Sequence, residues 1–225
     1  AVSFVVVVTF LFGVVSFVVV VKFLFGAVSF VVVVTFLFGA VSFVVVVTFL
    51  LGAVSVVAVT VGTQGGGITS TTGVLTGTGY TFNNTNSATV SAILAGAGAV
   101  TQAGAGTTIL SGANTYGGGT SVLAGTIKTG NASALGSAAV TVGANANSLG
   151  TIDLNGQSIA NNLTINGGGT TGAITNTSTT AATASGTVTL NSASSIDGTN
   201  AITLSGVVTS NANGLAFVGS GTYTL

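Results

Sequence analysis

The sequence predicts an all-β protein, with a parallel β-solenoid over residues 62–225 and a very hydrophobic segment over residues 1–61 before it. Short runs of alternating apolar and hydroxyl residues recur along the second part, as in half-buried strands. Asn-Gly and Asp-Gly dipeptides separate these runs, and both of their residues tolerate the positive φ of tight turns. Large apolar side chains are too few for a β-sandwich core. The aromatic residues of this part are Tyr80, Phe82, Tyr116, Phe217 and Tyr223.

The composition changes abruptly near residue 61, which predicts two domains, residues 1–61 and residues 62–225. Eleven of the 13 Phe lie in residues 1–52, whose other residues are mostly Val, Leu, Ala and Gly. Thirty-one of the 35 Gly follow residue 52, among many Thr, Ser, Asn and Ala residues. The chain has no Pro. Every backbone N–H can therefore donate to a sheet ladder.

The hydrophobic segment is a tandem repeat of 13 residues. AVSFVVVVTFLFG (1–13) recurs as VVSFVVVVKFLFG, AVSFVVVVTFLFG and AVSFVVVVTFLLG, which ends at Gly52. Within a copy, strand alternation places Val2, Phe4 and the other even positions on one face and the odd positions on the other. Because 13 is odd, a continuous strand would exchange its faces at each glycine. Each glycine is therefore expected to be a turn or a bulge.

Three interpretations of the hydrophobic segment stay open. Residues 1–21 and 23–61 are each long enough for a membrane helix, with a break near residues 22–26. The same residues have the high β-propensity and the lack of charge that favour aggregation-prone or solenoid-like strands. A translated minisatellite that does not fold natively is the third interpretation. A secretory signal peptide fits poorly, because no basic region precedes the apolar stretch.

The second part is expected to hold about seven coils, at ~4.8 Å and on the order of twenty-odd residues per coil. The expected turn dipeptides are Asn155-Gly156, Asn166-Gly167, Asp197-Gly198 and Asn213-Gly214. The expected strands are Thr89–Leu94, Thr107–Leu110, Thr120–Ala124, Ala139–Val142, Thr151–Leu154, Asn162–Ile165, Thr187–Leu190 and Ala201–Leu204.

The composition excludes several classes of function. The formal net charge is zero, and only 2% of the residues are charged. Lys22 and Lys128 alone cannot form the basic face that nucleic-acid binding requires. Cys and His are absent, so disulfides, thiolate or imidazole metal sites, and Cys- or His-based catalysis are impossible. We expect no catalytic, cofactor-binding or metal-binding residue, and no cofactor.

Asp153 and Asp197 are the only carboxylate side chains. A glycosidase pair would have to face each other across a cleft. We interpret Asp197 as a turn residue and Asp153 as an outward-facing strand residue, so both are expected to be exposed and tolerant of substitution by Asn. Lys128 is expected to be a solvated turn charge. Tyr116 is expected to be buried against the next coil.

Other motifs have structural interpretations. The glycine stretches at residues 65–67, 117–119 and 167–169 lack the Lys-Ser/Thr that follows a phosphate loop, so coil turns are expected. Asn83, Asn131, Asn162 and Asn176 satisfy N-x-[ST], which chance explains in a chain this rich in Asn, Ser and Thr.

Residues 104–127, GAGTTILSGANTYGGGTSVLAGTI, resemble the passenger-associated transport repeat of bacterial autotransporters. The pattern of that repeat is G-x-G-T-L-x-L-S-G-x-N-T-Y-T-G-G-T-x-V-x-x-G-T-L. Gly117 stands where Thr is usual, and Thr108 stands where Leu is usual. Residues 131–136 and 150–156 look like the usual continuation, and residues 219–225 resemble the opening of a further copy. The resemblance covers about residues 90–225.

The resemblance implies a right-handed parallel β-helix that a C-terminal β-barrel exports through the bacterial outer membrane. We expect that barrel to lie outside this chain. The expected function is that of a structural passenger stalk, displayed at the cell surface or secreted, that contributes to adhesion and is not an enzyme. Residues 1–61 are expected to provide any membrane association, and the surface ligand is left open.

The alternative is a β-solenoid that binds glycan or ice through its Thr and Ser faces. Such a face would need Thr-x-Thr at one position in every coil. The sequence shows this pattern clearly only at Thr187-Val188-Thr189.

Overall fold

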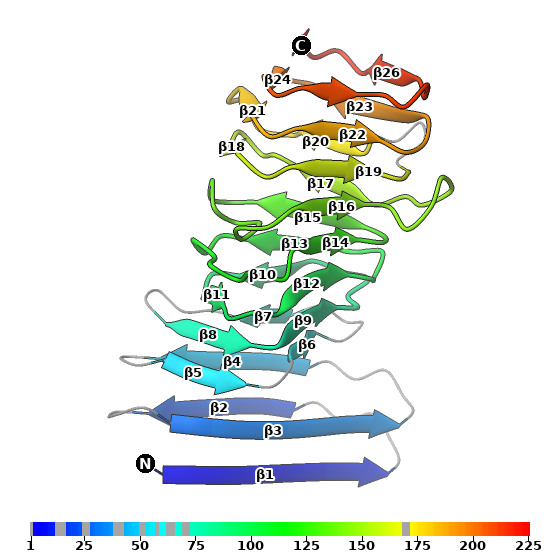
Figure 1. Ribbon diagram of the computed structural model, residues 1–225. Coiled ribbons are helices and arrows are strands. Elements are labelled where there is room, and N and C mark those ends of the chain that lie inside the picture. The colour runs from blue at the N-terminus through cyan, green and yellow to red at the C-terminus, as the bar shows by residue number, and fades with distance from the viewer. Residues whose placement is uncertain are drawn as a thin grey trace.

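The computed structural model describes the backbone of residues 2–11, 17–23, 28–37, 43–49, 53–56, 59–61, 66–68, 73–167 and 172–225. Side chains are described for residues 66–68, 73–167 and 172–225. Every regular element in these ranges is a β-strand, and the strands pair in parallel. They stack into a β-solenoid of about 7 turns with the termini at opposite ends, which confirms the predicted fold class (Figure 1).

The strands form four sheets along the axis and one further ladder. The N-terminal sheet contains β1 (Val2–Leu11), β3 (Val28–Leu37), β5 (Ala53–Val56), β8 (Val74–Gly77) and β11 (Ile93–Ala95). The ladder beside it joins β2 (Phe17–Phe23) to β4 (Phe43–Phe49). The C-terminal sheet contains β18 (Ser158–Ile159), β21 (Ala182–Ala184), β24 (Ile202–Leu204) and β27 (Tyr223–Thr224).

Two 8-stranded sheets run along most of the stack. The hydroxyl sheet contains β6 (Val59–Val61), β9 (Gly79–Phe82), β12 (Ala99–Gln102), β14 (Thr120–Val122), β16 (Val140–Val142), β19 (Leu163–Ile165), β22 (Val188–Leu190) and β25 (Val208–Thr209). The charged sheet contains β7 (Gly66–Ile68), β10 (Ala88–Val90), β13 (Thr107–Leu110), β15 (Thr126–Thr129), β17 (Thr151–Asp153), β20 (Ile174–Asn176), β23 (Ser194–Gly198) and β26 (Leu215–Val218).

The described residues of the hydrophobic segment form strands, which agrees with the interpretation as solenoid-like strands and contradicts the interpretation as membrane helices. β1 pairs with β3 in register from Val2 with Val28 to Leu11 with Leu37. The interval from Val2 to Val28 is twice the 13-residue repeat, so one coil contains two copies and each copy supplies one strand. β-Branched valines and the period-two alternation favour this arrangement over a helix. No helix among the described residues is long and apolar enough to cross a membrane.

The turns expected at Gly13, Gly26, Gly39 and Gly52 lie outside the described residues. The domain boundary near residue 61 stays a prediction from composition. The N-terminal sheet runs across that boundary, because β5 pairs with β3 on one side and with β8 on the other.

The core is a set of stacked columns between the sheets. In the hydroxyl sheet one inward column runs through Tyr80, Val100, Thr120, Val140 and Leu163, which are all buried. Strands of only two to five residues could not bury an apolar face alone. They are stabilised because each coil buries its apolar side chains against the coils next to it.

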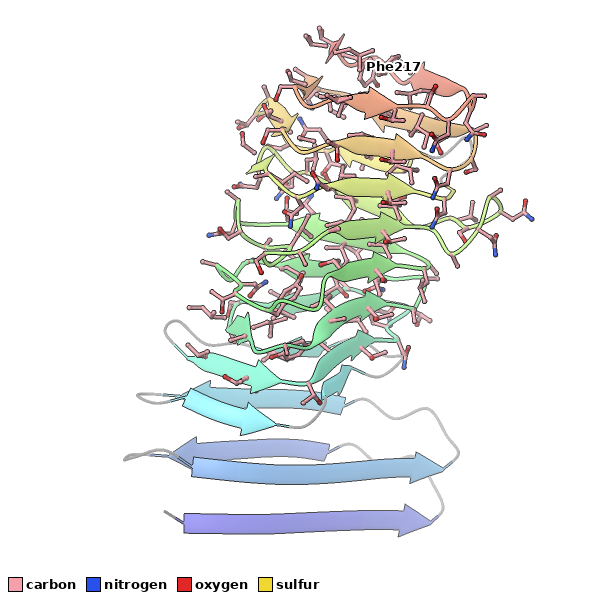
Figure 2. The ribbon with its side chains drawn as sticks, viewed as in Figure 1. Phe217 is labelled. Atoms are coloured by element: carbon pink, nitrogen blue, oxygen red, sulfur yellow. The ribbon has the colours of Figure 1, made fainter. Side chains whose placement is uncertain are left out.

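The C-terminal end of the stack is more exposed. There Phe217 in β26 is 40% exposed and packs against Tyr223, with ring centroids 5.0 Å apart (Figure 2).

Two turns show why the sequence needs its glycines. Asn155 and Gly156 both have positive φ, at 47° and 76°, as expected for this turn dipeptide. Gly136 has φ 69°, and a Cβ there would lie 2.6 Å from the carbonyl oxygen of Tyr116. The chain therefore passes too close to the tyrosine of the preceding coil for any other residue.

Two leucines test whether the coil interior carries the stability. Leu110 is fully buried, and Leu149 is 62% exposed. Leu110→Ala is expected to lower the free energy of unfolding by about 2–5 kcal/mol, because it leaves a cavity in the core. Leu149→Ala is expected to change it by at most about 0.5 kcal/mol. Urea unfolding followed by circular dichroism measures both, and equal effects would contradict the placement of the core.

Candidate functional site

Asp153 and Lys128 form an ion pair on the charged sheet. They are register partners in β17 and β15, and the Lys128 Nζ lies 3.2 Å from the Asp153 Oδ2. Lys128 is therefore a strand residue and not a turn charge. The Asp153 side chain is only 4% exposed, so the expectation that it faces solvent is wrong.

Three further donors explain why the Asp153 carboxylate can be buried. The backbone N–H of Asn155 donates to Oδ1 over 2.9 Å, and the backbone N–H of Thr177 does so over 3.1 Å. The Thr177 hydroxyl donates to Oδ2 over 2.6 Å and accepts from the Lys128 Nζ over 2.7 Å. A buried carboxylate is tolerated when it is paired and hydrogen-bonded in this way. These partners come from three coils, so strand alternation alone could not reveal them.

Asp197 does not join this cluster. It lies within β23 and not in a turn, and it is half-buried. Asp153, Thr175 and Asp197 occupy one column of the charged sheet, so Thr175 lies between the two carboxylates. The two aspartates therefore lie along one sheet, whereas a glycosidase pair faces each other across a cleft.

A column of hydroxyl side chains runs along the hydroxyl sheet, one from each of its eight strands. Of the members whose side chains the structure describes, those from Thr81 to Thr189 are half-buried and Thr209 is exposed. The strand residues on either side of each half-buried member are buried. The members are Thr60, Thr81, Thr101, Ser121, Thr141, Thr164, Thr189 and Thr209. We call this set the hydroxyl column.

The hydroxyl column is a surface feature that the sequence did not predict. The intervals between its members range from 20 residues, between Thr81 and Thr101, to 25, between Thr164 and Thr189. No fixed sequence period therefore reveals it. A shorter column of the same kind runs through Ser158, Thr183, Thr203 and Thr224 in the C-terminal sheet. Aligning the central Thr of each expected strand would have found part of the column, but β9 and β12 were not predicted.

An asparagine row lies next to the hydroxyl column. The Asn166 Nδ2 donates to the carbonyl of Gly143, the Asn191 Nδ2 donates to the Asn166 Oδ1 over 2.9 Å, and the Asn211 Nδ2 donates to the Asn191 Oδ1 over 3.4 Å. Each of these asparagines lies two residues after a hydroxyl-column member. This face of the hydroxyl sheet therefore presents a row of amide groups beside a row of hydroxyl groups, and neither row contains a charged side chain.

The polar residues of the 100–128 region connect neighbouring coils. The Asn114 Oδ1 accepts from the Leu94 N–H over 2.8 Å, and its Nδ2 donates to the Ala134 carbonyl over 2.6 Å. The Tyr116 hydroxyl lies 2.6 Å from the Thr120 hydroxyl in the core. Burial raises the pKa of Tyr116 above its usual value. The predicted burial of Tyr116 is confirmed.

A second buried polar cluster, which the sequence did not predict, joins Asn84, Gln102 and Thr108. The Gln102 Nε2 donates to the Asn84 Oδ1 over 3.2 Å, and the Thr108 hydroxyl donates to the Gln102 Oε1 over 2.6 Å. Thr108 is the residue that replaces the usual Leu of the repeat pattern. Its hydroxyl is accommodated because Asn84 and Gln102 supply partners for it.

The remaining sequence motifs have structural places. Gly119 has φ 83°, as a coil turn requires, whereas Gly66 and Gly67 lie in β7. The stretch 167–169 lies partly outside the described residues. Asn176 is buried and donates to the Thr180 and Ala201 carbonyls, which is a structural use of this N-x-[ST] asparagine. Among the described residues, no group of metal-binding side chains is gathered.

Comparison with protein families supports the resemblance. Residues 100–128 match the family model of the passenger-associated-transport-repeat, a match that is consistent with an autotransporter passenger domain. The matched stretch contains β13 and β14 and most of β12 and β15, and it includes Asn114 and Tyr116. The repeat and the solenoid together fit an autotransporter passenger stalk. Neither the curated proteins nor the solved structures yield a match to this chain.

The ion pair gives a test that separates the two aspartates, which the sequence alone predicted to behave alike. Asp153→Asn is expected to lower the free energy of unfolding by about 1–3 kcal/mol, because it weakens hydrogen bonds to a charged acceptor. The loss is smaller than for a fully buried pair because the Lys128 side chain is 29% exposed. The control Asp197→Asn is expected to change it by at most about 0.5 kcal/mol. Guanidinium unfolding at neutral pH measures both, and a mild effect at Asp153 would contradict the buried pair.

Proposed function

We propose that this chain is a structural stalk in an autotransporter-type passenger, displayed at the bacterial surface or secreted, where it contributes to adhesion by projecting other parts of the protein. The observation that carries the proposal is the match of residues 100–128 to the passenger-associated-transport-repeat within one continuous solenoid. The family suggests a surface or extracellular location.

The physical properties of the solenoid support a stalk. Parallel ladders join each coil to the next along the whole axis, so the rod is connected by backbone hydrogen bonds throughout its described length. The absence of cysteine is compatible with export as an unfolded chain, since no disulfide can form early. We propose that the stalk has no enzymatic role, that no nucleic acid is a partner, and that its translocator barrel is encoded outside residues 1–225.

A display experiment tests the stalk. The full chain, with an epitope tag at its N-terminal end, is placed between an export signal and an outer-membrane translocator. We expect antibody to label the epitope on intact cells. Added protease is expected to leave the region from β8 onwards largely intact, because most of its strands are paired on both sides and only those at the ends of the sheets have a free edge. A periplasmic marker protein that stays inaccessible to antibody shows that the outer membrane is intact. An epitope that is labelled only after lysis of such cells would contradict the proposal.

A second candidate function is favoured by the hydroxyl column. We infer that, if the stalk binds a ligand directly, the ligand is an uncharged hydroxyl-bearing surface, a glycan or ice, because the column offers one hydroxyl per coil and an amide row beside it. The competing interpretation is that Thr occupies these positions because it is polar and has high β-propensity.

Matched pairs of substitutions decide between these two interpretations. Thr141→Val with Thr164→Val removes two neighbouring hydroxyls of the column, and Thr183→Val with Thr203→Val removes two from the C-terminal sheet. If the column binds, the first pair is expected to reduce glycan-array binding or ice-recrystallisation inhibition at least tenfold, and the second to leave it unchanged. Equal effects of the two pairs, or no binding by the parent, would leave the column with a purely structural role.

A further inference from the structure

β1 and β3 have the same sequence, VSFVVVVTFL, and they pair in parallel with each residue beside its own counterpart. Neither strand contains a charged residue or a proline. Natural sheets use charges, prolines and bulges to prevent a strand from pairing with a foreign edge. The β1–β3 ladder has none of these devices, and its register runs without a break from Val2 with Val28 to Leu11 with Leu37. The edge of β3 that accepts β1 therefore cannot distinguish the β1 of its own chain from the β1 of another.

We propose that the hydrophobic repeats are a homotypic interaction surface, through which two copies of this chain associate by exchanging coils. In the exchanged form, β1 of one copy lies beside β3 of the other, in the register seen within one chain. Exchange of an identical element is a low-cost route to a dimer, because the ladder is the same in both forms. The proposal goes beyond the stalk function and does not depend on it.

Lys22 favours exchange over direct stacking of like strands. Within the chain, Lys22 of β2 lies opposite Thr48 of β4, and this is the one unlike pair in that ladder. Exchange places Lys22 of one copy opposite Thr48 of the other and preserves this pair. In-register stacking of β2 on β2 would instead place one Lys22 opposite another, and like charges directly opposite each other destabilise a sheet.

Concentration decides between the two forms. Within a chain, β1 meets β3 at a high effective concentration, about millimolar for short linkers. The exchanged form is therefore expected to grow as the protein concentration rises, whereas the closed form predominates when the protein is dilute.

Engineered cysteines test the exchange, because the natural chain contains none. Ser3 and Ser29 are register partners. Neighbouring strands are ~4.8 Å apart, which lies within the Cα separation that a disulfide spans. Full-length Ser3→Cys and Ser29→Cys chains, carrying different tags, are unfolded together, refolded at increasing total concentration and oxidised. We expect a disulfide that joins the two tags, with a yield that rises with concentration.

Two controls make the result decisive. In the first control, a Thr35→Cys chain replaces the Ser29→Cys chain. Thr35 lies six positions from the register partner of Ser3, so this control is expected to give at least fivefold less mixed disulfide. The double variant Ser3→Cys, Ser29→Cys in one chain is expected to form an internal disulfide when dilute, which shows that the ladder forms. A mixed yield no higher than the out-of-register control at every concentration would overturn the proposal, whether or not the internal disulfide forms.

Discussion

The parallel backbone ladder between successive coils is the constraint on which the rest of this structure depends. A parallel ladder aligns whole strands, so a residue in one coil lies directly beside its register partner in the next. Coils differ in length, yet the columns stay aligned because the turns take up the extra residues. The segment between β16 and β17, residues 143–150, projects from the stack and does not disturb the register of its strands (Figure 1). Columns of like side chains are the direct consequence.

The columns explain how a nearly uncharged chain can carry a polar surface. Outward positions of the hydroxyl sheet are filled by Thr and Ser, which combine a polar group with high β-propensity. Asparagine rows satisfy backbone carbonyls at the turns, as Asn166 does for Gly143 and Asn213 does for Leu190. The one ion pair of the described side chains, between Lys128 and Asp153, also lies in a column, and Thr177 from a third coil completes it.

Polar side chains of the 100–128 region connect neighbouring coils. Asn114 joins the coil before it to the coil after it, and Tyr116 fills the interior while its hydroxyl is satisfied by Thr120. Side chains of this kind fix the local register, because a slip of one residue would leave buried donors without acceptors. In this region the Asn and Tyr of the family pattern therefore serve coil stacking.

The sequence by itself determined the class of fold, the turn at Asn155-Gly156, seven of the fifteen strands described from Thr107 onwards, and the burial of Tyr116. These follow from local chemistry: period-two alternation, turn residues and a long specific motif. Only the tertiary structure decided that the 13-residue repeats pair at twice their length, that Asp153 is buried, and that eight hydroxyls share one column. The last two depend on which residue of a distant coil lies alongside, and coils of unequal length leave no sequence period that records that register. The first depends on how the chain turns between copies, because the 13-residue period is equally compatible with pairing of adjacent copies.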